Sequence, residues 1–176
     1  MKRLFFALWP DEAVRRNCAG IAKAIARPGE VRVRPDNLHA TLTFLGPVDA
    51  KTEAALIAAA SDISVPSLTL CFDTLCYWSK PRIICLTAQR HEAALDALVF
   101  ALTDLSRRFG LPVDERPFSP HVTLVRKVRS ETSLAFEPVS LRASGFCLVE
   151  SCSLPEGTVY KIIKSWENKS SIDSPG

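Results

Sequence analysis

Two short segments of this chain each carry a histidine and, two residues later, a threonine: His39 with Thr41, and His121 with Thr123. In a β-strand, side chains at positions i and i+2 leave the same face, so each histidine would lie beside its threonine. The residues that alternate with them are apolar and would face a core. An imidazole exchanges protons near neutral pH, and a hydroxyl can donate a hydrogen bond to an anion. Both segments are therefore candidate catalytic strands.

Two such strands together suit the hydrolysis of a phosphodiester. One imidazole would take a proton from water while the other gives a proton to the departing oxygen, and each transfer typically contributes ~10²–10⁴ in rate. Thr41 and Thr123 would donate hydrogen bonds to the non-bridging phosphate oxygens, where charge must be stabilised. The scheme uses no metal and no cofactor, and the sequence has no carboxylate cluster to hold a metal.

A histidine on a strand is more often structural than catalytic, but two of the three histidines stand at matched positions of an internal repeat. The shift that carries His39 onto His121 also carries Pro35 onto Pro117 and Leu4 onto Leu86. One repeat of this length is typical of a duplication rather than of a solenoid. It predicts two similar lobes that face each other across a groove, with one histidine strand from each. His91 has no companion threonine, and we expect it at the surface.

Hydrophobic periodicity and turn residues predict the elements between these motifs. We expect an α+β protein with two mainly antiparallel sheets flanking a central groove and helices outside. Residues 1–166 would form a single bilobal domain, with halves of about 1–82 and 83–166, and residues 167–176 would be disordered. The expected helices cover residues 10–27, 51–60 and 91–109; the expected strands cover 4–9, 31–34, 38–45, 68–72, 83–86, 121–126, 141–149 and 159–166.

Composition places the chain among globular proteins of ordinary size. It has 176 residues, 47% of them hydrophobic, and a formal net charge of +3, which by itself does not indicate tight nucleic-acid binding. No apolar run is long enough to cross a bilayer, and the apolar start lacks a signal-peptide cleavage site. The six cysteines lack zinc-finger spacing, which favours buried thiols in a reducing compartment. We expect a cytoplasmic monomer without membrane contact.

The flanks of both motifs resemble the RNA 2′,3′-cyclic phosphodiesterases, also called 2′-5′ RNA ligases, of the two-histidine phosphoesterase superfamily. Three segments carry the resemblance, which extends from about residue 3 to residue 166: RLFFAL at 3–8, NLHATLTFLG at 37–46 and PFSPHVTLVR at 117–126. A single His-x-Thr is unspecific, whereas two copies with these flanks are a specific signal.

The resemblance implies an enzyme that opens RNA 2′,3′-cyclic phosphate ends to 2′-phosphates, and whose reverse reaction joins a 5′-hydroxyl end through a 2′-5′ linkage. Its partners would be RNA ends, tRNA fragments among them, or nucleoside 2′,3′-cyclic phosphates. The resemblance also implies His39 as general acid toward the 3′-oxygen and His121 as general base toward water. The two motifs are alike and do not distinguish these roles. Positive charge after the second motif, at Arg126, Lys127 and Arg129, would lower the pKa of His121 and favour the neutral form of a base.

Phe44 and Arg126 each follow a histidine by five residues and would occupy equivalent places in the repeat. An aromatic ring and a guanidinium could hold a nucleobase between them. Strict alternation, however, puts positions i and i+5 on opposite faces, so both would point away from the histidines unless the strands twist or bulge. The alternative is that Phe44 is a core residue. For Arg126, the family resemblance also places an arginine at this position.

Other basic residues accompany both motifs, and they form either an RNA-binding surface or an ordinary solvated face. They are Arg32, Arg34, Lys80, Arg82, Arg116, Lys127 and Arg129. Two other functions stay open: a phosphodiesterase for a small cyclic nucleotide or a 2′-5′ oligonucleotide, and a nucleotide-binding module without catalysis. The intact histidines and threonines of both motifs argue against the second.

Overall fold

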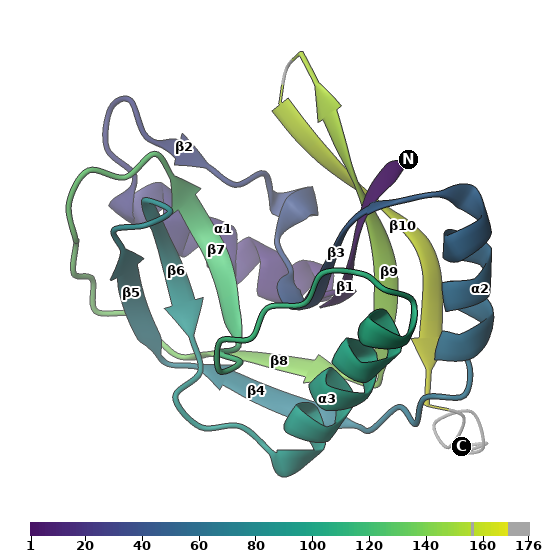
Figure 1. Cartoon of the computed structure of the whole chain (residues 1–176). Coiled ribbons are helices and arrows are strands. Elements are labelled where there is room, and N and C mark those ends of the chain that lie inside the picture. Colours follow the sequence, from purple (N-terminus) through teal and green to yellow (C-terminus); the bar gives the residue numbers. More distant parts are fainter. Residues whose placement is uncertain (156, 169–176) are drawn as a thin grey trace.

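The structure, a computed structural model, describes residues 1–155 and 157–168. Ten strands, three α-helices and one 3-10 turn make up the described part (Figure 1). In chain order these are β1 (Lys2–Leu8), α1 (Glu12–Ile25), β2 (Val31–Arg32), the turn η1 (Pro35–Asn37), β3 (Ala40–Val48), α2 (Ala50–Ala60), β4 (Leu68–Phe72), β5 (Thr74–Trp78), β6 (Ile83–Thr87), α3 (Ala93–Arg108), β7 (His121–Arg126), β8 (Val139–Ala143), β9 (Gly145–Leu154) and β10 (Gly157–Glu167).

Two of the three α-helices of the described part begin at an aspartate that caps them. Asp11 accepts a hydrogen bond from the backbone N–H of Val14 at the start of α1, and Asp49 accepts one from the backbone N–H of Thr52 at the start of α2. Each bond satisfies one of the N–H groups that a helix start leaves without an intrahelical partner. The buried residues of α1 recur every three or four positions, so this helix covers the core with one face.

All strand pairs are antiparallel, which confirms the predicted fold class. The large sheet has the order β10-β9-β1-β3-β7-β6-β5, with β2 paired to β7, and a small second sheet consists of β4 and β8. In the described part of the chain, β3 and β7 pair at one position, Ala40 with Val122. Beyond that pair the two strands separate, so the large sheet has two sides with a gap between them (Figure 1).

The shift that carries His39 onto His121 also carries β1 onto β6, α1 onto α3 and β3 onto β7. The two sides of the sheet do not follow the two halves of the chain, however. Strands β9 and β10 join β1 from the far end of the sequence, and β5 joins β6. The helices cross over in the same way, since α1 packs against β7 and β8 while α3 packs against β3 and α2.

Three expectations about elements need correction. Residues 74–78, which lie between two expected strands and were not expected to form one, make up strand β5, and the single strand expected over 141–149 is divided between β8 and β9. Glu167 ends β10, and the backbone N–H of Asn168 donates to the carbonyl of Ser144, so the chain is ordered two residues further than expected. The rest of the expected disordered tail, 169–176, lies outside the described residues. No described helix has both the length and the apolar character needed to span a membrane.

Candidate active site

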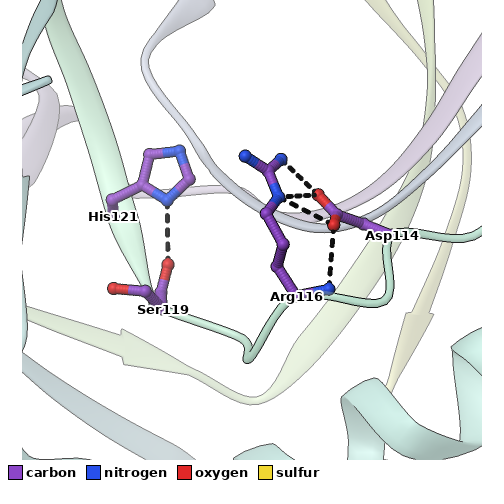
Figure 2. A network of polar contacts seen from close by, with 4 residues as sticks. All are labelled: Asp114, Arg116, Ser119 and His121. Carbon is purple, nitrogen blue, oxygen red and sulfur yellow. Dashed lines mark hydrogen bonds and ion pairs between the residues drawn. The ribbon is translucent and has the colours of Figure 1, made fainter. Parts of the chain in front are cut away.

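The two histidines are held in the same way. His39 directly precedes β3 and donates from Nδ1 to the carbonyl oxygen of Asn37 at 2.7 Å. His121 begins β7 and donates from Nδ1 to the carbonyl oxygen of Ser119 at 2.8 Å (Figure 2). A carbonyl can only accept, so each bond places the proton of the neutral ring on Nδ1. Nε2 of each ring can then take up or give a proton.

Thr41 lies beside His39, as the i and i+2 spacing predicts. Its Oγ1 is 2.9 Å from His39 Nε2 and donates to that nitrogen when the ring is neutral. Both histidines and both threonines line one cavity of about 990 Å³. The structure therefore brings together four candidate residues that form two widely separated pairs in the sequence.

A β-bulge in β3 decides where Phe44 points. Between Thr41 and Thr43, β3 has one more residue than the opposing part of β1. This extra residue, Leu42, shifts the alternation by one, so Phe44 returns to the face of His39. Phe44 is 58% exposed and lines the cavity, and the alternative that it is a core residue is wrong.

The same bulge occurs in β7. Between Thr123 and Val125, β7 has one more residue than the opposing part of β6. Leu124 is the extra residue, and Leu124 and Val125 are both buried although they are consecutive. Arg126 consequently lines the cavity together with Phe44. Each bulge lies three residues after its histidine. The repeat therefore includes the bulge that turns Phe44 and Arg126 toward the cavity.

Aromatic rings surround His39. The ring of Trp9 stacks on the imidazole at 5.6 Å between centroids, that of Phe5 lies at 4.8 Å and that of Tyr160 meets it edge-on at 4.9 Å. His121 has Trp78 at 4.6 Å. Sequence reasoning did not place these four aromatic residues in the site. Phe5 was within reach, because it lies in the segment 3–8 that carries the family resemblance, whereas Trp9, Trp78 and Tyr160 lie outside the segments that carry it.

Burial in this environment lowers the pKa of His39 from its ordinary value of 6.5 to about 4. The bond to the carbonyl of Asn37 opposes the shift, while the positive charges of Arg126 and of protonated His121 add to it. The pKa of His121 is also lowered, by burial, against the bond to Ser119. The expected direction for His121 is therefore right and its expected cause is wrong, because the charge of Arg126 acts on His39 across the groove.

Asn37 fixes the first histidine to the far end of the chain. Its side chain donates from Nδ2 to the carbonyl of Thr158 at 2.6 Å and accepts from the backbone N–H of Tyr160 at 3.1 Å. Its own carbonyl holds His39. One buried side chain thus ties strand β10, and the Tyr160 ring on it, to the first imidazole.

Of the basic residues expected near the site, Lys80, Arg116 and Arg126 line the cavity, and Arg3 and Arg107 line it as well. The remaining expected residues are not among its described lining. Arg3 was within reach of sequence reasoning, because it opens a segment that carries the family resemblance. Arg107 was not, because nothing in its neighbourhood marks the face of α3 on which it lies.

His91, expected at the surface, is half-buried, with its side chain 19% exposed. Its Nε2 is 2.8 Å from a carboxylate oxygen of Asp96, and its ring lies 6.2 Å from that of Phe118. Among the described residues, no group of three or more His, Cys, Asp or Glu side chains is arranged to hold a metal ion. All six cysteines are free.

Comparison with known proteins gives consistent results. The profile of the family described as LigT-like phosphoesterase matches residues 8–85. The chain is 34% identical over 160 residues to the RNA 2′,3′-cyclic phosphodiesterase of Escherichia coli (strain K12), covering 90% of this chain and 86% of that protein. It is 26% identical to the Archaeoglobus fulgidus protein of the same name, covering 94% of this chain and 99% of that protein.

The crystal structure of E. coli LigT complexed with 3′-AMP superposes with a TM-score of 0.86 at 31% identity, covering 96% of this chain and 98% of that one. A further crystal structure of E. coli LigT contains ATP, with a TM-score of 0.81 at 29% identity, covering 95% of this chain and 98% of that one. The resemblance drawn from the two histidine motifs is thereby confirmed, and the chain belongs to the LigT-like phosphoesterase family.

Proposed function

We propose that this protein hydrolyses the 2′,3′-cyclic phosphate ends of RNA to 2′-phosphates without a metal ion. One observation carries the proposal: two imidazoles, each with its Nδ1 bonded to a backbone carbonyl, line a single cavity together with a threonine apiece. The names of the relatives, RNA 2′,3′-cyclic phosphodiesterases, support the same reaction.

In the proposed reaction, water attacks phosphorus from one side while the 3′-oxygen leaves from the other. The base takes the proton of the water as the new P–O bond forms, and the acid gives its proton to the 3′-oxygen as the P–O3′ bond breaks. The product carries a 2′-phosphate and a 3′-hydroxyl. The hydroxyls of Thr41 and Thr123 donate hydrogen bonds to the non-bridging oxygens, whose charge grows in the transition state. When a 5′-hydroxyl attacks in place of water, the same steps form a 2′-5′ linkage.

We assign His39 as the acid and His121 as the base, following the family resemblance. These roles need a protonated His39 and a neutral His121. In the free protein the favoured form is the reverse, because His39 has the lower pKa and loses its proton first. The active form is then the minor one of the two singly protonated forms.

The terminal base would lie between Phe44 and Arg126, which the two bulges bring onto the groove face. We place the protein in the cytoplasm, because six free cysteines suit a reducing compartment. The monomer stays an expectation from the sequence. Its substrates would be RNA ends such as those of tRNA fragments, or nucleoside 2′,3′-cyclic phosphates.

The test is turnover of an oligonucleotide with a 2′,3′-cyclic phosphate end, followed by identification of the product. A 2′-phosphate product that forms equally well after exhaustive EDTA treatment is expected. Loss of activity on chelation and recovery with one divalent ion would contradict the metal-free mechanism. Binding without turnover would favour the nucleotide-binding module, and turnover confined to other cyclic nucleotides or 2′-5′ oligonucleotides would favour the other phosphodiesterase.

A further inference from the structure

The cavity continues from the histidine strands onto helix α3. Val99, Phe100, Thr103 and Arg107 line it, and their spacing puts them on one side of the helix. A different side of α3 supplies the core, through Leu95, Leu98, Leu102 and Leu105. One side of helix α3 therefore packs in the core, and another side lines the cavity.

Phe100 is the unusual member of this side. A single exposed hydrophobic side chain is ordinary in a soluble protein. However, two of the exposed large hydrophobic side chains in the described part of the chain line the cavity, and both are phenylalanines. Phe44 is 58% exposed and Phe100 is 68% exposed. Helix α3 packs against β3, and the hydroxyls of Thr43 and Thr103 are 3.5 Å apart, so α3 lies beside β3 next to Phe44.

Two arginines, Arg107 and Arg116, line the same cavity as Phe100. Arg107 donates to both carboxylate oxygens of Glu115 at 3.1 and 3.0 Å, and Arg116 donates from Nε to Asp114 at 2.9 Å (Figure 2). The segment that carries Glu115 and Arg116 runs from the end of α3 to the start of β7 (Figure 1). The exposed pair of Arg107 and Glu115 is weak, so this guanidinium can exchange its carboxylate partner for a phosphate at little cost.

We propose that this side of α3 binds the nucleotide on the 5′ side of the cyclic phosphate end. Its base stacks on Phe100, and Arg107 contacts the phosphate that precedes it. Phe100 and Arg107 are seven residues apart, about 10 Å along the helix, so base and phosphate engage different turns. The inference rests on the proposed function and deepens it: of the two substrates named there, RNA ends are preferred to nucleoside 2′,3′-cyclic phosphates because the α3 side binds a second nucleotide.

The size of the cavity agrees with this assignment. Its volume of about 990 Å³ lies at the upper end of the range of roughly 300–1,000 Å³ for sites that enclose one small ligand. Phe44 and Arg126 account for the terminal base, and the α3 side offers the next aromatic surface in the same cavity. Stacking accepts any base, so the site would have little sequence preference.

The experiment compares kcat/KM for a trinucleotide with a 2′,3′-cyclic phosphate end with kcat/KM for the mononucleoside 2′,3′-cyclic phosphate. Wild-type protein should prefer the trinucleotide. Phe100→Ala should lower the ratio of the two constants by about 5- to 150-fold, the range for stacking one base on an aromatic side chain. Arg107→Gln should lower the ratio as well and reduce its dependence on salt.

Two variants serve as matched controls. Arg108 is the neighbour of Arg107, pairs with Asp104 at 3.3 Å and does not line the cavity, so Arg108→Gln removes the same charge elsewhere. Ile162 is an exposed hydrophobic residue outside the cavity, and Ile162→Ala removes a comparable surface. Both should keep the wild-type ratio.

A wild-type ratio near one, or equal losses on both substrates in Phe100→Ala, would overturn the inference while leaving the hydrolase intact. If neither substrate is turned over, the proposed function fails instead. Fluorescence anisotropy with the same trinucleotide then decides about the α3 side: weaker binding by Phe100→Ala than by Ile162→Ala supports the inference, and equal binding overturns it.

Discussion

His39 and His121 have the same local geometry and different surroundings. Each donates from Nδ1 to the carbonyl two residues earlier, and each is followed by a threonine and a bulge. Around His39, however, three aromatic rings close in, whereas around His121 the ring contact comes from Trp78. The duplication thus supplies two equivalent proton carriers, and the residues packed on them make their pKa values unequal.

Removing either imidazole tests whether turnover needs both histidines. His39→Ala and His121→Ala should each lower turnover of a cyclic phosphate by about 10²–10⁴, because each removes one proton transfer. Thermal unfolding should show that both variants are folded, and His91→Ala should retain wild-type turnover as a matched control. A folded variant of either residue with near-normal turnover would contradict the two-histidine mechanism.

A substrate that needs no general acid shows which histidine is the acid and which is the base. With a bridging 3′-thiolate leaving group, His39→Ala should regain most of its lost rate, since a thiolate departs without a proton. His121→Ala should remain slow, because water still needs a base. Rescue of His121→Ala instead would reverse the assignment of acid and base.

The threonines test whether the two sides hold the phosphate equally. Thr41→Val and Thr123→Val should each cost about 2–4 kcal/mol of transition-state stabilisation, the scale for one oxyanion donor. Thr41→Val should cost more, because Thr41 also bonds His39 Nε2. Serine at either position keeps the hydroxyl and should keep most of the rate. Little change in both valine variants would mean that other donors hold the phosphate.

The smallest expected effect is a shift in the pH dependence of kcat/KM. The wild-type profile should be bell-shaped, because catalysis needs one protonated and one neutral imidazole. The limbs should fall near the pKa of about 4 for His39 and the lowered pKa, below 6.5, for His121, so activity should decline as the pH rises past the second limb.

Tyr160→Ala should move the lower limb upward, because water then reaches the His39 ring and its pKa rises toward 6.5. Tyr160→Phe keeps the ring and should leave the profile unchanged. NMR titration of the two imidazoles measures the same shift directly. An unmoved pKa of His39 in Tyr160→Ala would show that this ring is not what desolvates it.

The sequence by itself determined the features that depend on local spacing. Alternation along a strand put each threonine beside its histidine, and the shift from His39 to His121 matched the two strands before any contact was known. Helix positions followed from the spacing of apolar residues and from turn residues between the helices. The fold class and the family follow from the same signals.

Only the tertiary structure decided where Phe44 and Arg126 point, because a bulge is defined by the partner strand and not by the strand that carries it. The low pKa of His39 likewise comes from burial, and one of the rings packed on the imidazole, that of Tyr160, lies on β10 near the other end of the sequence. Arg107 entered the cavity because α3 lies against the other half of the repeat. Burial and register are properties of what an element packs against, and one segment's sequence does not contain its neighbours.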